Sequence, residues 1–209
     1  MRGHITKRIV KDNTTELVQR ATIDLDFLLL IVFAAAICAL GFKMNNASAI
    51  VGAMIISPLM YSILSASIAS YNRDWLSFKK SILTFATGTF VAILTSILVG
   101  FYYSTSIRSE ISGRIAEAPL DYFLIAIFCG LGGTYAFFSP KTHQAVGGIA
   151  ISVALLPPII MSGIGLGIGI TEQNIDLAVS SSKIVLSNLL GIYLGSLVMI
   201  IFLNRISKD

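Results

Sequence analysis

Charged residues are scarce in this chain, and their scarcity argues against most classes of soluble protein. Asp, Glu, Lys and Arg make up 12% of the 209 residues, whereas an ordinary globular domain carries about 25%. Hydrophobic residues make up 55%, and the mean hydropathy is +0.83. The composition therefore predicts an integral membrane protein whose surroundings are a lipid bilayer.

Cysteine and histidine are also few. Cys38 and Cys129 each lie in an apolar run without a CxxC motif, and neither His4 nor His143 lies within such a run. This pattern offers neither a disulfide framework nor the ligand spacing of a metal site. We expect two buried, reduced cysteines, no metal site and no cofactor.

Signatures of catalysis and of nucleic-acid binding are missing from the sequence as well. It contains no nucleophile with a base, no paired carboxylates and no glycine loop after a strand. The net charge is +4, but the basic residues lie at the ends and in loops, without a basic face or an aromatic platform. We therefore expect no enzymatic activity and no nucleic-acid partner.

Long apolar runs take up most of the chain. Most are long enough for a hydrocarbon core of about 30 Å, which takes about 20 helical residues. None of the six contains Asp, Glu, Lys, Arg or His, which argues against a carboxylate-driven antiporter. The six expected spans are 27–42, 47–70, 81–103, 122–138, 145–170 and 184–203.

The second half of the chain repeats the first. A shift of 95 residues aligns residues 25–57 with 120–152 and gives nine identities, among them Ser57 with Ser152. After eight extra residues the match resumes at a shift of 103, where Gly88 meets Gly191. Each copy holds three spans, so the second copy enters the membrane from the opposite side. An inverted repeat of this kind is common in transporters.

The sequence thus predicts an all-α integral membrane fold with six transmembrane helices in a 3+3 inverted repeat. With six spans, eleven of the fifteen Lys and Arg residues fall on one side, which predicts that both termini are cytoplasmic. The expected parts are an N-terminal tail (1–24), a first repeat (25–104), an extracytoplasmic loop (105–118), a second repeat (119–204) and a C-terminal tail (205–209).

Two of the expected spans contain proline near the middle, in SPLM at 57–60 and in LLPP at 155–158. A proline removes a helical hydrogen bond and frees a carbonyl, which hydrocarbon cannot satisfy but a lined cavity can. We therefore expect Pro and Gly to break the second and fifth helices, and a midplane ligand site where they meet. The candidate ligand-binding residues are Gly52, Ser57, Pro58, Gly147, Gly148, Ser152, Pro157, Pro158 and Asn188.

A purely structural interpretation stays open for these residues. Prolines kink helices whose freed carbonyls bond to Ser or Thr of neighbouring helices, and glycines allow close packing. Asn188, the only Asn or Gln in an expected span, fits either a hydrogen bond between helices or ligand contact. For the alternating glycines of 163–169 we expect packing or a hinge rather than ligand contact.

Three runs resemble a known family: VGAMIISPLM with the following RDWLSFKKS, then AVGGIAISVALLPPIIMSGIGLG, then SNLLGIYLGSL. They are similar to bacterial membrane proteins called domain of unknown function 389, and the resemblance covers about residues 25–204. It implies a membrane fold in the bacterial plasma (inner) membrane. The family has no established activity, and many members carry a soluble cytoplasmic domain where this chain has a short N-terminal tail.

The repeat and the paired breaks favour a small-solute transporter or channel whose partner is an unknown small molecule or ion. Hydroxyls, amides and exposed backbone offer contacts for a neutral or anionic solute. The alternative is a membrane ligand-binding sensor or scaffold without transport, which the absence of charged coupling residues favours. In either case glycine-rich faces predict a homo-oligomer.

The topology can be tested with a compartment-sensitive reporter fused to each end in turn. Because the basic residues concentrate on one side, both fusions should report the cytoplasm. An extracytoplasmic signal from either fusion would contradict the predicted cytoplasmic placement of both ends.

Overall fold

The computed structural model describes residues 17, 21–102, 119–139, 144–172 and 175–206. The regular structure of these residues is helical throughout, so the predicted all-α class is confirmed for them. The helices are α2 (Leu25–Lys43), α3 (Ala47–Ile56), α4 (Leu59–Tyr71), α5 (Trp75–Tyr102), α7 (Pro119–Phe138), α8 (Gln144–Glu172) and α9 (Asp176–Ile206). The expected loop 105–118 and most of the tail 1–24 lie outside the described residues.

The helices have the length and the surface of membrane spans. Five of the described helices are long and apolar enough to cross a membrane: α2, α5, α7, α8 and α9. Their outward faces carry large exposed apolar side chains such as Phe33, Phe90, Leu98 and Phe128. Such faces suit hydrocarbon and not water. The chain is therefore a membrane protein; which membrane it occupies and which side holds its ends stay predictions.

The second expected span is broken where the sequence predicts. Helix α3 ends at Ile56, α4 begins at Leu59, and the two are bent by 50°. Ser57 between them is extended, and Pro58 has no N–H to continue the α3 hydrogen bonds. Counted as one span, the pair gives up to six spans; the repeat relation between the halves stays a prediction.

The expected break in the fifth span is wrong. Helix α8 continues from Gln144 to Glu172 with Pro157 and Pro158 inside it. Pro158 cannot donate to the carbonyl of Ala154 four residues earlier. That carbonyl instead accepts a hydrogen bond of 2.7 Å from the side-chain Nδ2 of Asn188 on α9. A neighbouring helix thus replaces one lost bond, and the helical path survives.

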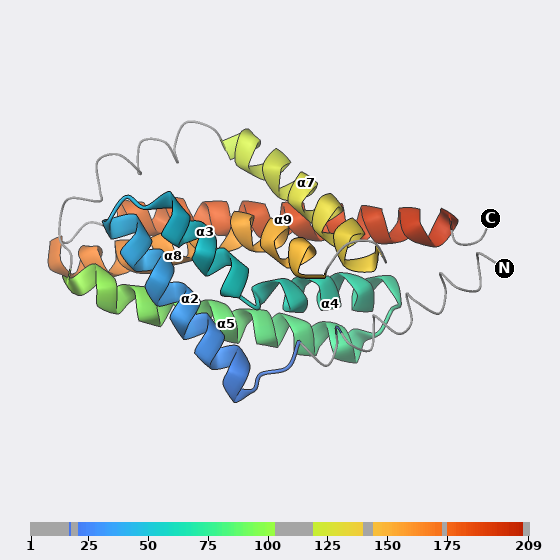
Figure 1. Ribbon diagram of the computed structural model, residues 1–209, viewed down its shortest axis with the longest axis horizontal. Coiled ribbons are helices and arrows are strands. Elements are labelled where there is room, and N and C mark those ends of the chain that lie inside the picture. The colour runs from blue at the N-terminus through green and yellow to red at the C-terminus, as the bar shows by residue number, and fades with distance from the viewer. Residues whose placement is uncertain (1–16, 18–20, 103–118, 140–143, 173–174, 207–209) are drawn as a thin grey trace.

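Helix α8 is the centre of the molecule. Its apolar window is 72% buried, whereas those of the other four long helices are 28–39% buried. It packs against each of the other described helices. Figure 1 shows α5 and α9 along the long axis of the molecule and α2 and α7 oblique to it. A ligand site on the middle of α8 would therefore lie among helices from both halves of the chain.

The glycines of α8 let two neighbours approach its backbone. A Cβ on Gly167 would lie 2.6 Å from the carbonyl oxygen of Ile97 on α5, and one on Gly165 would lie 2.6 Å from the backbone nitrogen of Ala178 on α9. Gly163 faces α5 in the same way, against Ser96. The packing role expected for these three glycines is confirmed.

Gly167→Ala is expected to lower the melting temperature in detergent, because its methyl group would press on the α5 backbone. Overpacking of this kind costs about 1–3 kcal/mol, and in a chain of this size each kcal/mol corresponds to about 2–4 °C. Gly52→Ala is the control, because a Cβ there meets nothing within 4 Å. Equal melting of Gly167→Ala and the native protein would contradict the close approach of α8 to α5.

Candidate functional site

The predicted site residues fall into two groups on α8 and its neighbours. Ser57 and Pro58 at the α3–α4 break lie with Ser152 at one level of α8. Pro157, Pro158 and Asn188 line a cavity farther along α8. Gly52 lies in α3 beside open space. Gly147 and Gly148 lie in the first turns of α8, and their surroundings are outside the described part.

The two serines that the predicted repeat pairs, Ser57 and Ser152, contact each other. The Ser152 hydroxyl donates to the Ser57 carbonyl at 3.4 Å, which is a long hydrogen bond between two buried residues. Ser57 Oγ is buried and makes no hydrogen bond to a described residue. Neither serine lines the cavity at the prolines. Their contact joins α3 to α8 and is a packing contact rather than a cavity wall.

The side chain of Asn188 bonds to a backbone carbonyl of α8. It is 2% exposed, and its amide group bonds to the Ala154 carbonyl. Because a carbonyl only accepts, the NH2 group must face Ala154 and Oδ1 must face away. Oδ1 is buried and makes no hydrogen bond to a described residue. Of the two roles that the sequence left open for Asn188, the structure contains the hydrogen bond between helices. One strong acceptor is left over, and ligand contact stays a prediction.

The carbonyl of Pro158 accepts a hydrogen bond from a side chain of α8 itself. The Ser162 hydroxyl donates to the Pro158 carbonyl at 2.8 Å, and the Ser182 hydroxyl of α9 lies 3.3 Å from Ser162 Oγ. Hydroxyls that bond back to a carbonyl four residues earlier are common where a helix departs from ideal geometry. The double proline is thus held by polar contacts to α9 at two levels.

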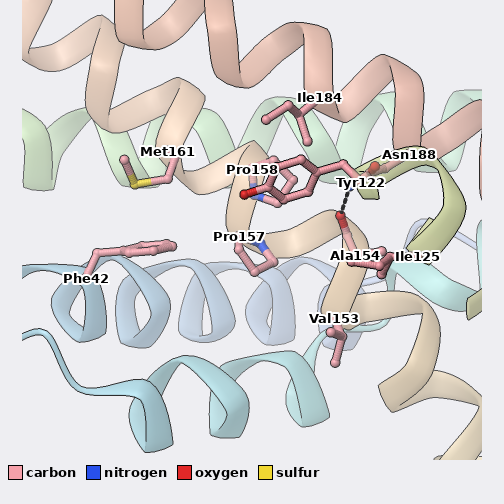
Figure 2. A pocket seen from close by; sticks show the side chains of 10 residues that line it. All are labelled: Phe42, Tyr122, Ile125, Val153, Ala154, Pro157, Pro158, Met161, Ile184 and Asn188. Carbon is pink, nitrogen blue, oxygen red and sulfur yellow. Dashed lines mark hydrogen bonds between the residues drawn. The ribbon is translucent and has the colours of Figure 1, made fainter. Parts of the chain in front are cut away.

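A cavity of about 290 Å³ lies against the prolines, and it opens at the surface of the bundle where Val153 is 39% and Ile125 51% exposed. Four helices contribute to it: the end of α2, the start of α7, the middle of α8 and the first half of α9 (Figure 2). Small-molecule sites are usually of about 300–1,000 Å³, so its size suits a small ligand. The lining residues are Phe42, Tyr122, Ile125, Val153, Ala154, Pro157, Pro158, Met161, Ile184 and Asn188.

The cavity lining is apolar with two polar side chains, both uncharged. Figure 2 shows Pro157 and Pro158 among side chains of the other helices, with Asn188 bonded to Ala154. Tyr122 adds a phenol, and Asn188 adds its amide. Among the described residues, the lining includes no carboxylate, amine, guanidinium or imidazole. A lining of this kind suits a neutral molecule better than an ion, which would lose its water there.

Sequence reasoning found three of the cavity residues and missed the rest. Phe42, Ile125, Met161 and Ile184 carry no signal, because an apolar wall residue reads like any core residue. Tyr122 could have been noticed in the sequence. The predicted repeat aligns it with Phe27, so this position has a phenol hydroxyl in the second half of the chain and none in the first.

The chain matches the family described as Domain of unknown function (DUF389) over residues 54–194. The matched part holds the α3–α4 break, both prolines of α8 and Asn188. The chain belongs to the DUF389 family. The family resemblance carried by the sequence motifs is confirmed.

One curated relative of this DUF389 chain is Uncharacterized protein MJ0678 of Methanocaldococcus jannaschii. The two are 27% identical over 181 residues, which is 85% of this chain and 54% of the relative. The DUF389 chain thus spans about half the length of the curated relative it matches. That relative is archaeal, so a bacterial source stays a prediction. No solved structure matches the DUF389 chain.

Asn188→Leu is expected to lower the unfolding free energy by about 1 kcal/mol, because the Ala154 carbonyl would lose its donor. Pro158→Ala restores a backbone N–H that can reach the same carbonyl. The cost of Asn188→Leu should therefore fall by half or more in the Pro158→Ala background. Unfolding of all four proteins of this double-mutant cycle in detergent gives the coupling. Additive effects would show that Asn188 does not replace the proline's missing bond.

Proposed function

We propose that this DUF389 protein is a transporter or channel for a small neutral solute, and that the solute binds in the cavity at Pro157, Pro158 and Asn188. The observation that carries the proposal is the buried, unpaired Oδ1 of Asn188 on a small apolar cavity of the central helix. An unpaired buried acceptor costs about 1–3 kcal/mol. Oδ1 is covered in this structure, so a small local movement would let a solute in the cavity reach it with an N–H or O–H and remove that cost.

The depth of the cavity supports a role in crossing the membrane. Pro157 and Pro158 lie in the middle of α8, about 20 Å from either end at 1.5 Å per residue. A site at that depth is reached from both sides over similar distances. Transporters built from inverted repeats hold their ligands near the midplane for this reason.

The chemistry of the lining favours a neutral solute over the anion that the sequence also allowed. An anion site would use the free N–H groups of a helix start. Helix α8 has no new start at its prolines, and Leu59 and Met60, which begin α4 after the break, do not line the cavity. The polar contacts that remain are an amide and a phenol.

The packing of the two halves supports the inverted repeat. Gly88 of α5 faces Phe27 of α2, and its repeat partner Gly191 of α9 faces Ala126 of α7. In each half a glycine thus packs the third span on the first. Between the halves, the third span of the first half, α5, packs on the second span of the other half, α8. The second span of the first half packs in the same way on the third span of the other, through α4 and α9. A twofold axis in the membrane plane requires such a matching pair of contacts.

A second candidate function is a ligand-binding sensor or scaffold without transport. The continuity of α8 favours it, because only one of the two expected helix breaks is present. A transporter with two broken helices has flexible points in both halves, whereas here the break lies in one half. The same cavity would then bind its solute without releasing it on the other side.

Flux through proteoliposomes separates these functions. Stopped-flow light scattering should show faster entry of urea, acetamide or glycerol than in empty vesicles, and no faster entry of formate or potassium. Tyr122→Phe should slow the entry of the best solute about five-fold, as loss of a hydrogen bond of about 1 kcal/mol implies. The double variant Pro158→Ala with Asn188→Leu should slow the entry of this solute further. Its α8 stays intact, because Pro158→Ala restores the backbone hydrogen bond to the Ala154 carbonyl.

Tyr135→Phe is the matched control, because Tyr135 lies on the same helix, is exposed and does not line the cavity. It should leave every rate unchanged. Binding of one of these solutes without flux would favour the sensor. Faster entry of formate or potassium would contradict the neutral-solute assignment while leaving a channel in place.

A further inference from the structure

One end of the helix bundle gathers positive charge. The Tyr193 hydroxyl of α9 donates to Ser70 Oγ of α4 at 2.7 Å, and Asn204 Nδ2 donates to the Tyr71 hydroxyl. These bonds place the α4–α5 turn beside the last turns of α9. The described basic residues at this end are Arg73, Lys79, Lys80 and Arg205.

The acidic residue of the turn is engaged locally. Asp74 accepts from the Ser77 hydroxyl at 2.6 Å and from the Ser77 backbone N–H at 3.1 Å. These bonds, with a smaller contribution from Lys80, hold the pKa of Asp74 below its usual range. Asp74 therefore stays ionised as the cap of α5. The three basic residues of the segment 73–80 outnumber it.

An exposed aromatic pair lies directly beside this charge. Trp75 is 65% exposed and stacks on Phe78 at 5.2 Å between ring centroids. The Lys79 ammonium lies 5.7 Å from the Trp75 ring centroid. An exposed Trp at the start of an apolar helix is typical of the membrane–water interface. Lys79 is thus positioned at the depth of lipid headgroups.

An apolar groove of about 210 Å³ continues from Phe78 between α4, α5 and α9. Phe78, Ile82 and Phe85 form its α5 wall over about 10 Å of helix. Ile82 is 43% and Leu190 51% exposed, so the groove opens toward the hydrocarbon. The other lining residues are Ser62, Ile63, Ala66, Leu189 and Tyr193.

The polar side chains along the groove are turned to other partners. The Ser62 hydroxyl donates to the Leu59 carbonyl at 2.8 Å, and the Tyr193 hydroxyl donates to Ser70. The groove therefore presents carbon to its occupant. A hydrocarbon chain fits such a lining and a polar solute does not.

We propose that this groove holds one acyl chain of an anionic phospholipid whose phosphate lies against Lys79 and Trp75. The charge favours an anionic headgroup, since each basic residue near the surface attracts such lipids by about 1 kcal/mol. The groove begins at Phe78, which also stacks on Trp75, so chain and headgroup occupy adjoining contacts on one helix. The site is separate from the cavity on α8 and does not depend on transport.

The test compares phosphatidylglycerol with phosphatidylcholine of identical acyl chains, each added to the purified protein in detergent. Phosphatidylglycerol should raise the melting temperature by about 3 °C or more at saturation, and phosphatidylcholine by less than half of that. Lys79→Gln should remove most of the difference between the lipids. Lys183→Gln, which changes a basic residue in the first half of α9, should keep it.

Ile82→Trp tests the groove itself. The larger ring should fill it, keep the protein folded and abolish the lipid-dependent shift. Equal shifts from the two lipids, or a phosphatidylglycerol shift that survives both Lys79→Gln and Ile82→Trp, would overturn the proposal. Native mass spectra that show a lipid-free dimer, converted to monomer by Ile82→Trp, would overturn it too, because a second copy would then occupy the groove.

Discussion

The hydrogen bond from Asn188 to the Ala154 carbonyl is the contact on which the central helix depends. Two consecutive prolines remove two hydrogen bonds from the middle of α8. The side chain of α9 replaces one of them. Because α8 packs against each of the other described helices, a break there would disturb both halves of the molecule. The same amide also forms part of the cavity wall, so fold and candidate site share one residue.

The sequence predicts the elements of this fold better than their continuity. The apolar runs place the spans, and Ser57 and Pro58 place the break between α3 and α4 correctly. LLPP was expected to act in the same way, but it does not, because the outcome depends on a donor 34 residues later in the chain. Local sequence shows that a proline removes a bond, whereas only the tertiary structure shows whether another helix replaces it.

The candidate site, too, could be predicted from the sequence only in part. The predicted repeat pairs Ser57 with Ser152, and the structure brings the two together. They form a packing contact and do not line the cavity. Asn188 was marked by its polarity within an apolar run. The walls formed by Phe42, Ile125 and Ile184 could not be predicted, because apolar residues that face a cavity and those that face a neighbour have the same composition and spacing.

The corner between α2 and α3 connects one wall of the cavity to the helix break. A Cβ on Gly41 would lie 2.8 Å from Cγ1 of Ile50, and the Asn46 N–H donates to the Gly41 carbonyl at 2.9 Å, so the two helices are joined at close range. Phe42, next to Gly41, is a wall of the cavity. Helix α3 is about 15 Å long, so one short helix connects the break at Ser57–Pro58 with the corner that holds Phe42. The direction of α3 after the bend therefore bears on where the Phe42 ring lies in the cavity wall.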